Sequence, residues 1–194
     1  MVVAAVGAGS EDALLGLPVK DSKLLSPRQR NDLYAVLVRR CSVAMVIIPA
    51  ERIDSSRQSI TMNECVARAH AAVIRKLRPV TAYVDACDVN EDRYSRMVKA
   101  HLQESCEIVS RHHADATYPI VSAASIVAKV TRDAEIERLK ETCGPIGSGY
   151  PSDPETIAYL SSYIREHRCP PPIARKSWKT VTGMLDDLSQ ARLF

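Results

Sequence analysis

Short apolar runs alternate along this chain with longer segments in which apolar residues recur every three or four positions. Short runs rich in β-branched residues predict strands. Such runs lie at residues 2–6, 43–48, 81–84 and 107–110. Gly7 and Pro49 follow the first two runs, and both residue types end strands, so we expect short strands separated by turns and helices.

Helix start signals precede the segments with helical spacing. Ser26 and Gln29, with a proline between them, form an N-cap and its capping partner for a helix that ends near Arg40. Thr61 and Glu64 form a second capping box. Helices are predicted at residues 27–40, 62–77, 92–102, 118–141, 154–167 and 176–188. Strands that alternate with helices and end in a helical tail predict an α/β sheet with some parallel pairing.

Composition limits the class of protein. The chain has 194 residues, of which 46% are hydrophobic and 25% charged, and this suits a single compact globular domain. It contains no uninterrupted apolar stretch of membrane-spanning length, and residues 1–10 lack the basic start of a secretory signal. We therefore expect a soluble, cytoplasmic protein.

Cysteine spacing and charge add two further indications. The six cysteines include no CxxC pair and no Cys/His pair at zinc-ligand spacing, so we expect reduced, mostly buried thiols and no disulfide. The net charge of +3 suits a polyanionic partner, and basic residues cluster within residues 20–40 and 165–179. Solvated helix faces explain these clusters equally well.

Two aspartates stand where predicted strands lead into the next element. Asp85 ends a strand, and open α/β sheets bind ligands at the carboxyl ends of strands. Asp115 follows another strand and precedes the long helix, whose dipole favours a negative charge there. Taken alone, Asp85 or Asp88 is more simply interpreted as a cap of the next turn. Asp115 alone is equally well interpreted as an ordinary acid at a helix start. Together, two such carboxylates indicate a site for Mg²⁺ or a similar hard cation.

The long helix carries polar residues at helical spacing. Ser122, Ser125, Lys129 and Arg132 share one predicted face, opposite a face of small apolar residues. From this position Lys129 can contact a phosphate. An ion pair between Lys129 and Asp133 is an equal alternative.

The segment GSGYPSD places Tyr150 in a turn-forming loop, which is an exposed position for a large amphipathic side chain. A tyrosine there can stack on a sugar or base and form a hydrogen bond with a 2′-hydroxyl group. Without further context, a core-anchoring tyrosine is the simpler interpretation.

In combination these segments resemble archaeal-type ribonuclease HII. The resemblance rests on YVDACDV with Asp85, HHADATYPIVSAASIVAKVTRD with Asp115, GSGYPSDP with Tyr150, and PVKDSKLLSPRQR with Lys20 and Lys23. The match runs in order over about the whole chain, and SAASIVAKVTRD together with GSGYPSD is highly specific.

The resemblance implies a ribonuclease H-like α/β fold, in which helices flank a mixed sheet and a helical extension follows. It implies a catalytic core in residues 1–145, and a substrate-contacting loop with C-terminal helices in residues 146–194, packed as one structural unit. It also implies an endonuclease that uses Mg²⁺ or Mn²⁺. Its substrates would be RNA in RNA–DNA hybrids and ribonucleotides embedded in duplex DNA, cut to leave 5′-phosphate and 3′-hydroxyl ends.

Carried over residue by residue, Asp85 and Asp115 match catalytic metal ligands of the family, and Tyr150 matches the tyrosine that senses the 2′-hydroxyl group. The positions around the substrate phosphates are matched by Lys20, Lys23 and Lys129. In the implied mechanism, two metal ions about 4 Å apart activate a water and stabilise the leaving 3′-oxygen.

One part of the family pattern has no counterpart in the sequence. The family's first strand carries an adjacent Asp-Glu and comes before the segment that resembles MVVAAVGAG, whereas Glu11 and Asp12 come after it and receive no catalytic role. We expect the native protein to begin upstream of Met1 with such a strand, and the 194-residue chain alone to cleave weakly or not at all. The alternative is a non-catalytic relative that binds RNA–DNA hybrids.

The C-terminus carries a weak partner signal. Gln190 to Phe194 resembles the start of a sliding-clamp peptide, Q-x-x-L followed by aromatic residues, although its aromatic residue comes too early. The end of an amphipathic helix is the favoured interpretation.

Overall fold

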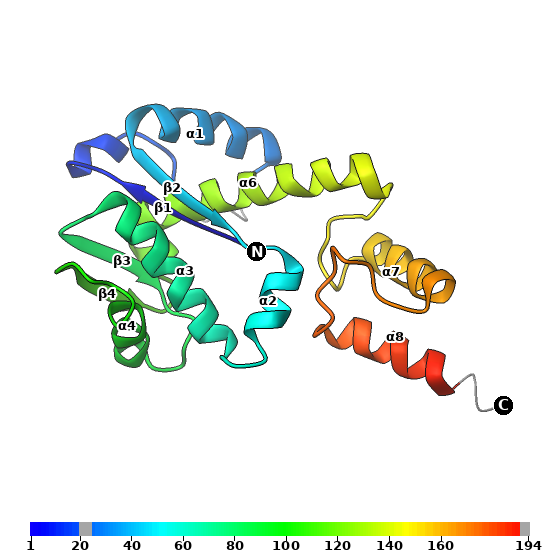
Figure 1. Cartoon of the computed structure of the whole chain (residues 1–194). Coiled ribbons are helices and arrows are strands. Elements are labelled where there is room, and N and C mark those ends of the chain that lie inside the picture. Colours follow the sequence, from blue (N-terminus) through cyan, green and yellow to red (C-terminus); the bar gives the residue numbers. More distant parts are fainter. Residues whose placement is uncertain (20–24, 191–194) are drawn as a thin grey trace. The chain divides into compact units, whose positions relative to one another are not determined.

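The computed structural model describes residues 1–19 and 25–190 of the chain (Figure 1). The elements in chain order are β1 (Val2–Gly7), the 3-10 helix η1 (Glu11–Leu14), α1 (Pro27–Arg40), β2 (Ser42–Ile47), α2 (Ala50–Ser56), α3 (Met62–Leu77), β3 (Thr81–Asp85), α4 (Glu91–Lys99), β4 (Glu107–Arg111), α5 (Ala114–Thr117), α6 (Pro119–Cys143), α7 (Pro154–His167) and α8 (Lys179–Gln190). The four predicted strands and six predicted helices are confirmed, with ends that differ by a few residues.

The capping signal at Ser26 acts as the sequence predicts, and the signal at Thr61 does so in part. Ser26 Oγ accepts a hydrogen bond from the Gln29 backbone N–H at 3.3 Å, and Gln29 Oε1 accepts from the Ser26 N–H at 2.9 Å. Thr61 Oγ1 likewise accepts from the Glu64 N–H at 3.2 Å. Each bond satisfies an N–H that has no partner inside its helix, so α1 and α3 begin where the caps place them. The Glu64 carboxylate instead contacts Arg68 and His101, so the second predicted capping box is only half formed.

Three short elements were missed, and one helix starts later than predicted. The elements η1, α2 and α5 have four to seven residues, too few for helical periodicity to appear in the sequence. Helix α8 starts at Lys179 instead of Lys176, because the Lys176 N–H donates to Asp54 Oδ2 at 2.6 Å and the Ser177 hydroxyl donates to Asp54 Oδ1 at 2.8 Å. These contacts hold the residues ahead of α8 in a non-helical conformation.

The chain divides into two compact units. The larger unit contains Val2–Ile47 and Ile60–Arg132, and the smaller unit contains Met1, Ile48–Ser59 and Asp133–Phe194. Helix α6 contributes residues to both. The division predicted at residues 145/146 remains a prediction.

The strands of the larger unit form two ladders. Strands β1 and β2 are antiparallel, with Val2 opposite Ile47 and Gly7 opposite Ser42. Strands β3 and β4 are parallel, with Asp85 opposite Arg111, which confirms the predicted parallel pairing. Within the described residues, each of these sheets has two strands. The parallel pair brings the carboxyl ends of β3 and β4 to one edge.

Helices cover these strands with two apolar clusters. One cluster joins α3, β3 and α4 and includes Ala71, Val84 and the fully buried Tyr94. The other joins β1, α1 and α6 and includes Val6 and Leu37. Helix α3 also packs on β1 and β2 (Figure 1). The strands therefore lie between helices, as expected for an α/β protein.

Helix α6 corrects one prediction. Ser122 was assigned to a polar face, yet it is 1% exposed and lies among the buried residues of α6, between Val121 and Ala123. The buried stripe of this helix is therefore wider than the spacing of its apolar residues predicts.

The smaller unit has its own apolar cluster between α7 and α8. It includes Leu160 and Ile164 of α7 and Val181 of α8, with Trp178 packed beside them. Across the described part of the chain, no helix combines the length and the apolar character needed to cross a membrane.

The cysteines correct another prediction. All six lie within the described residues and are free thiols, but only Cys65 and Cys106 are buried. Cys87 and Cys169 are exposed, so the expectation of mostly buried thiols is wrong. Sequence composition favours buried cysteines on average and carries no information about individual positions.

Candidate active site

Strand β3 and helix α5 bring the two predicted acids close together. Asp85 ends β3, and its Oδ1 accepts a hydrogen bond from the backbone N–H of Ala114 at 3.1 Å. Ala114 opens α5, and Asp115 is the next residue, in the first turn of that helix. The Asp85 side chain is exposed and that of Asp115 is half-buried. Two carboxylates from separate segments therefore lie at the carboxyl edge of the β3–β4 pair.

The turn ahead of Asp115 has a left-handed backbone. His113 precedes α5 with a φ of 52°, in the left-handed region that, apart from glycine, is adopted mainly by asparagine, aspartate and histidine. Asp115 itself stands in the short helix α5, which ends at Thr117 before α6 begins at Pro119. The prediction that Asp115 directly precedes the long helix thus missed a separate helical turn.

Glu91 of α4 forms hydrogen bonds with the turn before Asp115, at Arg111 and His112. Its Oε1 accepts from the His112 backbone N–H at 2.6 Å, and its Oε2 accepts from Arg111 Nη1 at 3.2 Å. The backbone hydrogen bond from His112, together with the charge of Arg111, lowers the pKa of Glu91. Sequence reasoning missed this residue, since an acid in the first turn of a helix is common and its partners lie about twenty residues away.

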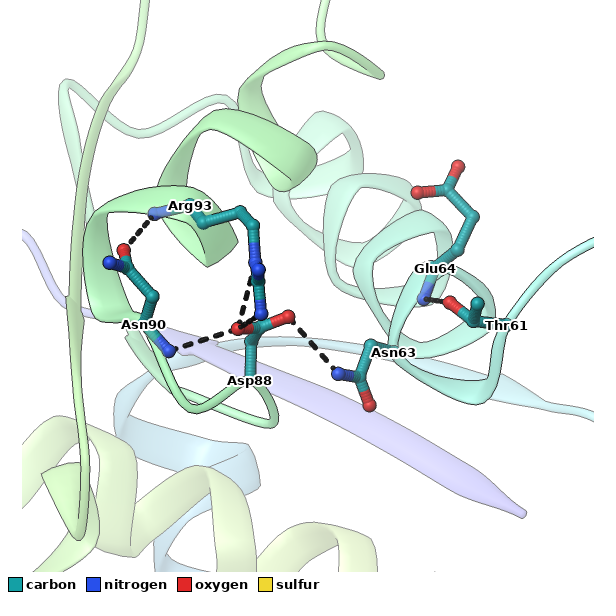
Figure 2. A network of polar contacts seen from close by, with 6 residues as sticks. All are labelled: Thr61, Asn63, Glu64, Asp88, Asn90 and Arg93. Carbon is teal, nitrogen blue, oxygen red and sulfur yellow. Dashed lines mark hydrogen bonds and ion pairs between the residues drawn. The ribbon is translucent and has the colours of Figure 1, made fainter.

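Asp88, the other aspartate after β3, is held by hydrogen bonds inside the fold, unlike the exposed Asp85. It is buried, and Figure 2 shows its carboxylate between α3 and the start of α4. Oδ1 accepts from the Asn90 N–H at 2.9 Å and from Arg93 Nε at 3.0 Å, while Asn63 Nδ2 donates to Oδ2 at 3.2 Å. The hydrogen bonds from Arg93 lower the pKa of Asp88 to about 2.

These partners separate the roles of the two aspartates. Asp88 makes the turn contact that was the simpler reading for both, by accepting from a backbone N–H two residues later. Asp85 instead accepts from a segment 29 residues away and remains at the surface. Of the two, Asp85 is the carboxylate placed to meet a ligand.

A pair formed by the buried Tyr94 and the half-buried His70 lies behind β3. The Tyr94 hydroxyl and His70 Nδ1 are 2.9 Å apart, and the two rings meet edge to face with centroids 5.9 Å apart. Burial lowers the pKa of His70 to about 4, so its imidazole is uncharged at neutral pH. In the tautomer with the proton on Nε2, Nδ1 accepts a hydrogen bond from the Tyr94 hydroxyl.

The donor atoms fit a hard divalent cation. Carboxylate oxygens of Asp85 and Asp115 are the ligands that Mg²⁺ and Mn²⁺ prefer, and such sites often use only one or two protein carboxylates beside water and phosphate. Residues 1–19 and 25–190 contain no cluster of three or more His, Cys, Asp or Glu side chains that could hold a metal ion. Within the described residues, the segments that carry Asp85 and Asp115 therefore meet without a third such side chain beside them.

The remaining predicted residues are placed as follows. Lys20 and Lys23 lie outside the described residues. Lys129 is on α6 with a half-buried side chain. Tyr150 lies in the loop between α6 and α7 in the smaller unit, and 45% of its side chain is exposed, as the loop prediction requires.

Known proteins that are similar to this chain belong to one family. Residues 1–181 match the family model for ribonuclease HII. The chain belongs to the ribonuclease HII family. A curated ribonuclease HII from Methanoregula boonei is 60% identical over 193 residues, covering 100% of this chain and 91% of the relative.

Two solved structures of this family share the fold. Ribonuclease H2 from Pyrococcus horikoshii superposes with a TM-score of 0.85 at 35% identity, covering 98% of this chain and 100% of the other. The ribonuclease HII in the PCNA:RNase HII complex from Archaeoglobus fulgidus gives a TM-score of 0.86 at 41% identity, covering 96% and 91%. The described α/β arrangement is therefore the ribonuclease H-like fold.

Proposed function

We propose that this ribonuclease HII family member hydrolyses phosphodiester bonds of RNA in RNA–DNA hybrids and at ribonucleotides embedded in duplex DNA. The hydrogen bond from the Ala114 N–H to Asp85 carries the proposal, because it joins the acid that ends β3 to the segment that carries Asp115. Hydrolysis of the bond between the phosphorus and the 3′-oxygen would leave 5′-phosphate and 3′-hydroxyl ends.

In this proposal Asp85 and Asp115 hold divalent cations, Mg²⁺ or Mn²⁺. Bound in pairs, such ions supply an activated water and stabilise the leaving 3′-oxygen. The Ala114 N–H orients one oxygen of Asp85 and leaves the carboxylate at the surface. Tyr150 would contact the 2′-hydroxyl group, and Lys129, Lys20 and Lys23 the phosphates.

The number of acids sets an expectation for the 194-residue chain. Two carboxylates neutralise less of the charge of two divalent ions than the four that the family resemblance implies. We therefore expect very weak or no cleavage by this polypeptide in Mn²⁺, and much faster cleavage when the family's Asp-Glu strand is joined ahead of Met1.

The test is cleavage of a duplex that contains one ribonucleotide, compared between the 194-residue chain and the extended chain. Asp85→Asn in the extended chain should abolish cleavage without changing its circular dichroism spectrum, and Asp92→Asn is a matched exposed control on α4. Rapid cleavage by the 194-residue chain would refute the expectation about the acids. Full activity of Asp85→Asn would refute the site.

The alternative function is binding of RNA–DNA hybrids without cleavage, and it is considered because two acids, Asp85 and Asp115, lie on segments that meet. A relative that binds hybrids without cutting them would keep the basic and aromatic residues while lacking a complete metal site. The extended chain separates the two functions, since a pure binding protein stays inactive with the added strand while retaining affinity for the hybrid.

We also propose a weak contact with a sliding clamp through Gln190 to Phe194. Support comes from the family relationship to the Archaeoglobus fulgidus protein whose structure is a PCNA:RNase HII complex. Gln190 ends α8, and residues 191–194 lie outside the described residues. Deletion of residues 190–194 should remove clamp binding in calorimetry; unchanged binding would place the contact elsewhere.

A further inference from the structure

The loop that carries Tyr150 is held at both ends by one pair of side chains. It runs from Gly147 to Asp153 between α6 and α7, and the Asp153 N–H donates to the Tyr150 carbonyl at 3.1 Å, closing a turn around the tyrosine. Tyr150 therefore lies at the corner of a closed loop in the smaller unit.

The Asp153 carboxylate reaches back to the start of this loop. Asp153 is the N-cap residue of α7, but its side chain makes no cap hydrogen bond to that helix. Instead, its Oδ2 accepts from the Ser148 backbone N–H at 2.6 Å and from the Ser148 hydroxyl at 2.8 Å. These bonds lower the pKa of Asp153 to about 2, so the carboxylate is ionised at neutral pH.

Thr156 completes the fastening from the first turn of α7. Its side chain is buried, and its hydroxyl oxygen accepts from the Gly149 N–H at 2.9 Å. The same hydroxyl lies 2.9 Å from the Ile146 carbonyl and 3.0 Å from Asp153 Oδ2, either of which can accept its proton. Two successive N–H groups ahead of Tyr150, those of Ser148 and Gly149, are thus bound by residues that follow it.

Gly147 makes this close approach possible. A Cβ atom there would meet the Asp153 carboxylate and would lie 2.6 Å from the Thr156 nitrogen, and the residue has a φ of 67°. A side chain is therefore excluded twice, by space and by backbone conformation. The glycine lets the start of the loop lie directly against the first turn of α7.

We infer that Asp153 and Thr156 are positioning residues for Tyr150, which they hold where the tyrosine can distinguish a ribonucleotide from a deoxyribonucleotide. The inference rests on the proposed function, which gives Tyr150 the 2′-hydroxyl contact. The backbone ahead of the tyrosine is bound at Ser148 and Gly149, and the Tyr150 carbonyl accepts from the Asp153 N–H, so the backbone is held on both sides of Tyr150. Preorganisation of this kind lowers the entropy lost on binding.

A merely structural role for Asp153 is the competing explanation, since an acid at a helix N-terminus also stabilises the helix. The two explanations differ in what a substitution changes. A structural role weakens binding of all duplexes alike, whereas positioning of Tyr150 affects only the preference for the ribonucleotide.

The experiment measures fluorescence anisotropy of the full 194-residue chain with two duplexes in EDTA, one all-DNA and one with a single ribonucleotide. The quantity compared is the ratio of the two dissociation constants. Tyr150→Ala should remove the preference for the ribonucleotide. Asp153→Ala should reduce that preference by about threefold to tenfold, the value of one or two hydrogen bonds, with little change for the all-DNA duplex.

Further variants test action through the tyrosine. In the Tyr150→Ala background, Asp153→Ala should cause no additional loss of preference. Asp153→Asn, which keeps an oxygen for the Ser148 N–H, should restore part of it. Ser148→Ala removes one hydroxyl from an exposed residue and should reduce the preference even if Asp153→Ala folds poorly.

Each outcome decides a separate claim. If Tyr150→Ala keeps the preference, the role of Tyr150 and the inference built on it are both wrong. If Tyr150→Ala loses the preference while Asp153→Ala and Ser148→Ala keep it, only the positioning role is wrong. An equal loss of affinity for both duplexes in Asp153→Ala would assign the residue to helix stability alone.

Discussion

Acid should destabilise the larger unit through His70, well above the pH at which most carboxylates titrate. His70 is on α3, joined to Tyr94 of α4, and burial lowers its pKa from 6.5 to about 4. The folded state therefore resists protonation that the unfolded chain accepts readily below pH 6.5. Stability from the neutral imidazole is complete above pH 6.5 and falls as the pH drops from 6.5 towards 4.

The size of the effect follows from the shift. A difference of about 2.5 pKa units corresponds to about 3 kcal/mol once the pH is below 4, and to about 2 kcal/mol at pH 5. These values are upper limits, because the His70 side chain keeps some exposure to solvent. A loss of about 2 kcal/mol is a large share of the stability of an ordinary domain.

The perturbation is His70→Asn, which retains an acceptor near Nδ1 for the Tyr94 hydroxyl but does not titrate. Urea unfolding followed by circular dichroism at pH 7 and pH 5 gives the loss of stability for each protein. Tryptophan fluorescence is unsuitable, because Trp178 lies in the smaller unit. The wild type should lose about 2 kcal/mol more than His70→Asn between the two pH values.

His112→Asn is the matched control, since His112 has an exposed side chain in the same unit. It should lose as much stability as the wild type. Equal losses in the wild type and His70→Asn would refute the reasoning, because burial of the neutral imidazole would then contribute nothing to the pH dependence.

Three other predictions follow from the larger unit. Glu91→Ala should weaken Mn²⁺ binding more than Glu91→Gln, since the amide oxygen can still accept the His112 N–H; titration monitored by electron paramagnetic resonance measures both. Asp88→Asn should be less stable than the wild type at pH 7, and the difference should shrink as the pH falls from about 4 towards 2, as urea unfolding can measure. Leu37→Ala should cost about 2–5 kcal/mol in the same assay, while the adjacent, exposed Val38→Ala should cost little.

Clear results would contradict each of them. Equal Mn²⁺ affinities for Glu91→Ala and the wild type would remove the role of Glu91 in holding the turn before Asp115. A constant stability difference for Asp88→Asn from pH 7 to pH 2 would mean that its charge does not stabilise the fold. Equal costs at residues 37 and 38 would contradict the packing of α1.

The parts of the fold that were predictable are those with a local cause. Ser26 and Thr61 cap helices that begin at the next residue, so the cap and the helix start lie in the same short segment. Runs of β-branched residues marked each strand of the described residues. The start of α8 was not predictable, because it depends on Asp54, which lies 122 residues before Lys176. The burial of Ser122 likewise depends on neighbours brought there by the fold.

The candidate site follows the same rule. Asp85 and Asp115 were predicted from their places at or after the ends of strands. The hydrogen bond from the Ala114 N–H joins Asp85 to the segment that carries Asp115. The sequence did not show which of Asp85 and Asp88 caps the turn and which lies at the surface. Their roles depend on the distant partners Asn63 and Ala114. Glu91 was missed because its contacts cross from α4 to the turn after β4.

The most direct test of the central claim is Mn²⁺ binding by the 194-residue chain, monitored by electron paramagnetic resonance, with Asp85→Asn and Asp115→Asn compared. If both acids share one site, each substitution should weaken the same saturable binding to a similar extent. The account is contradicted if either variant binds Mn²⁺ as the wild type does.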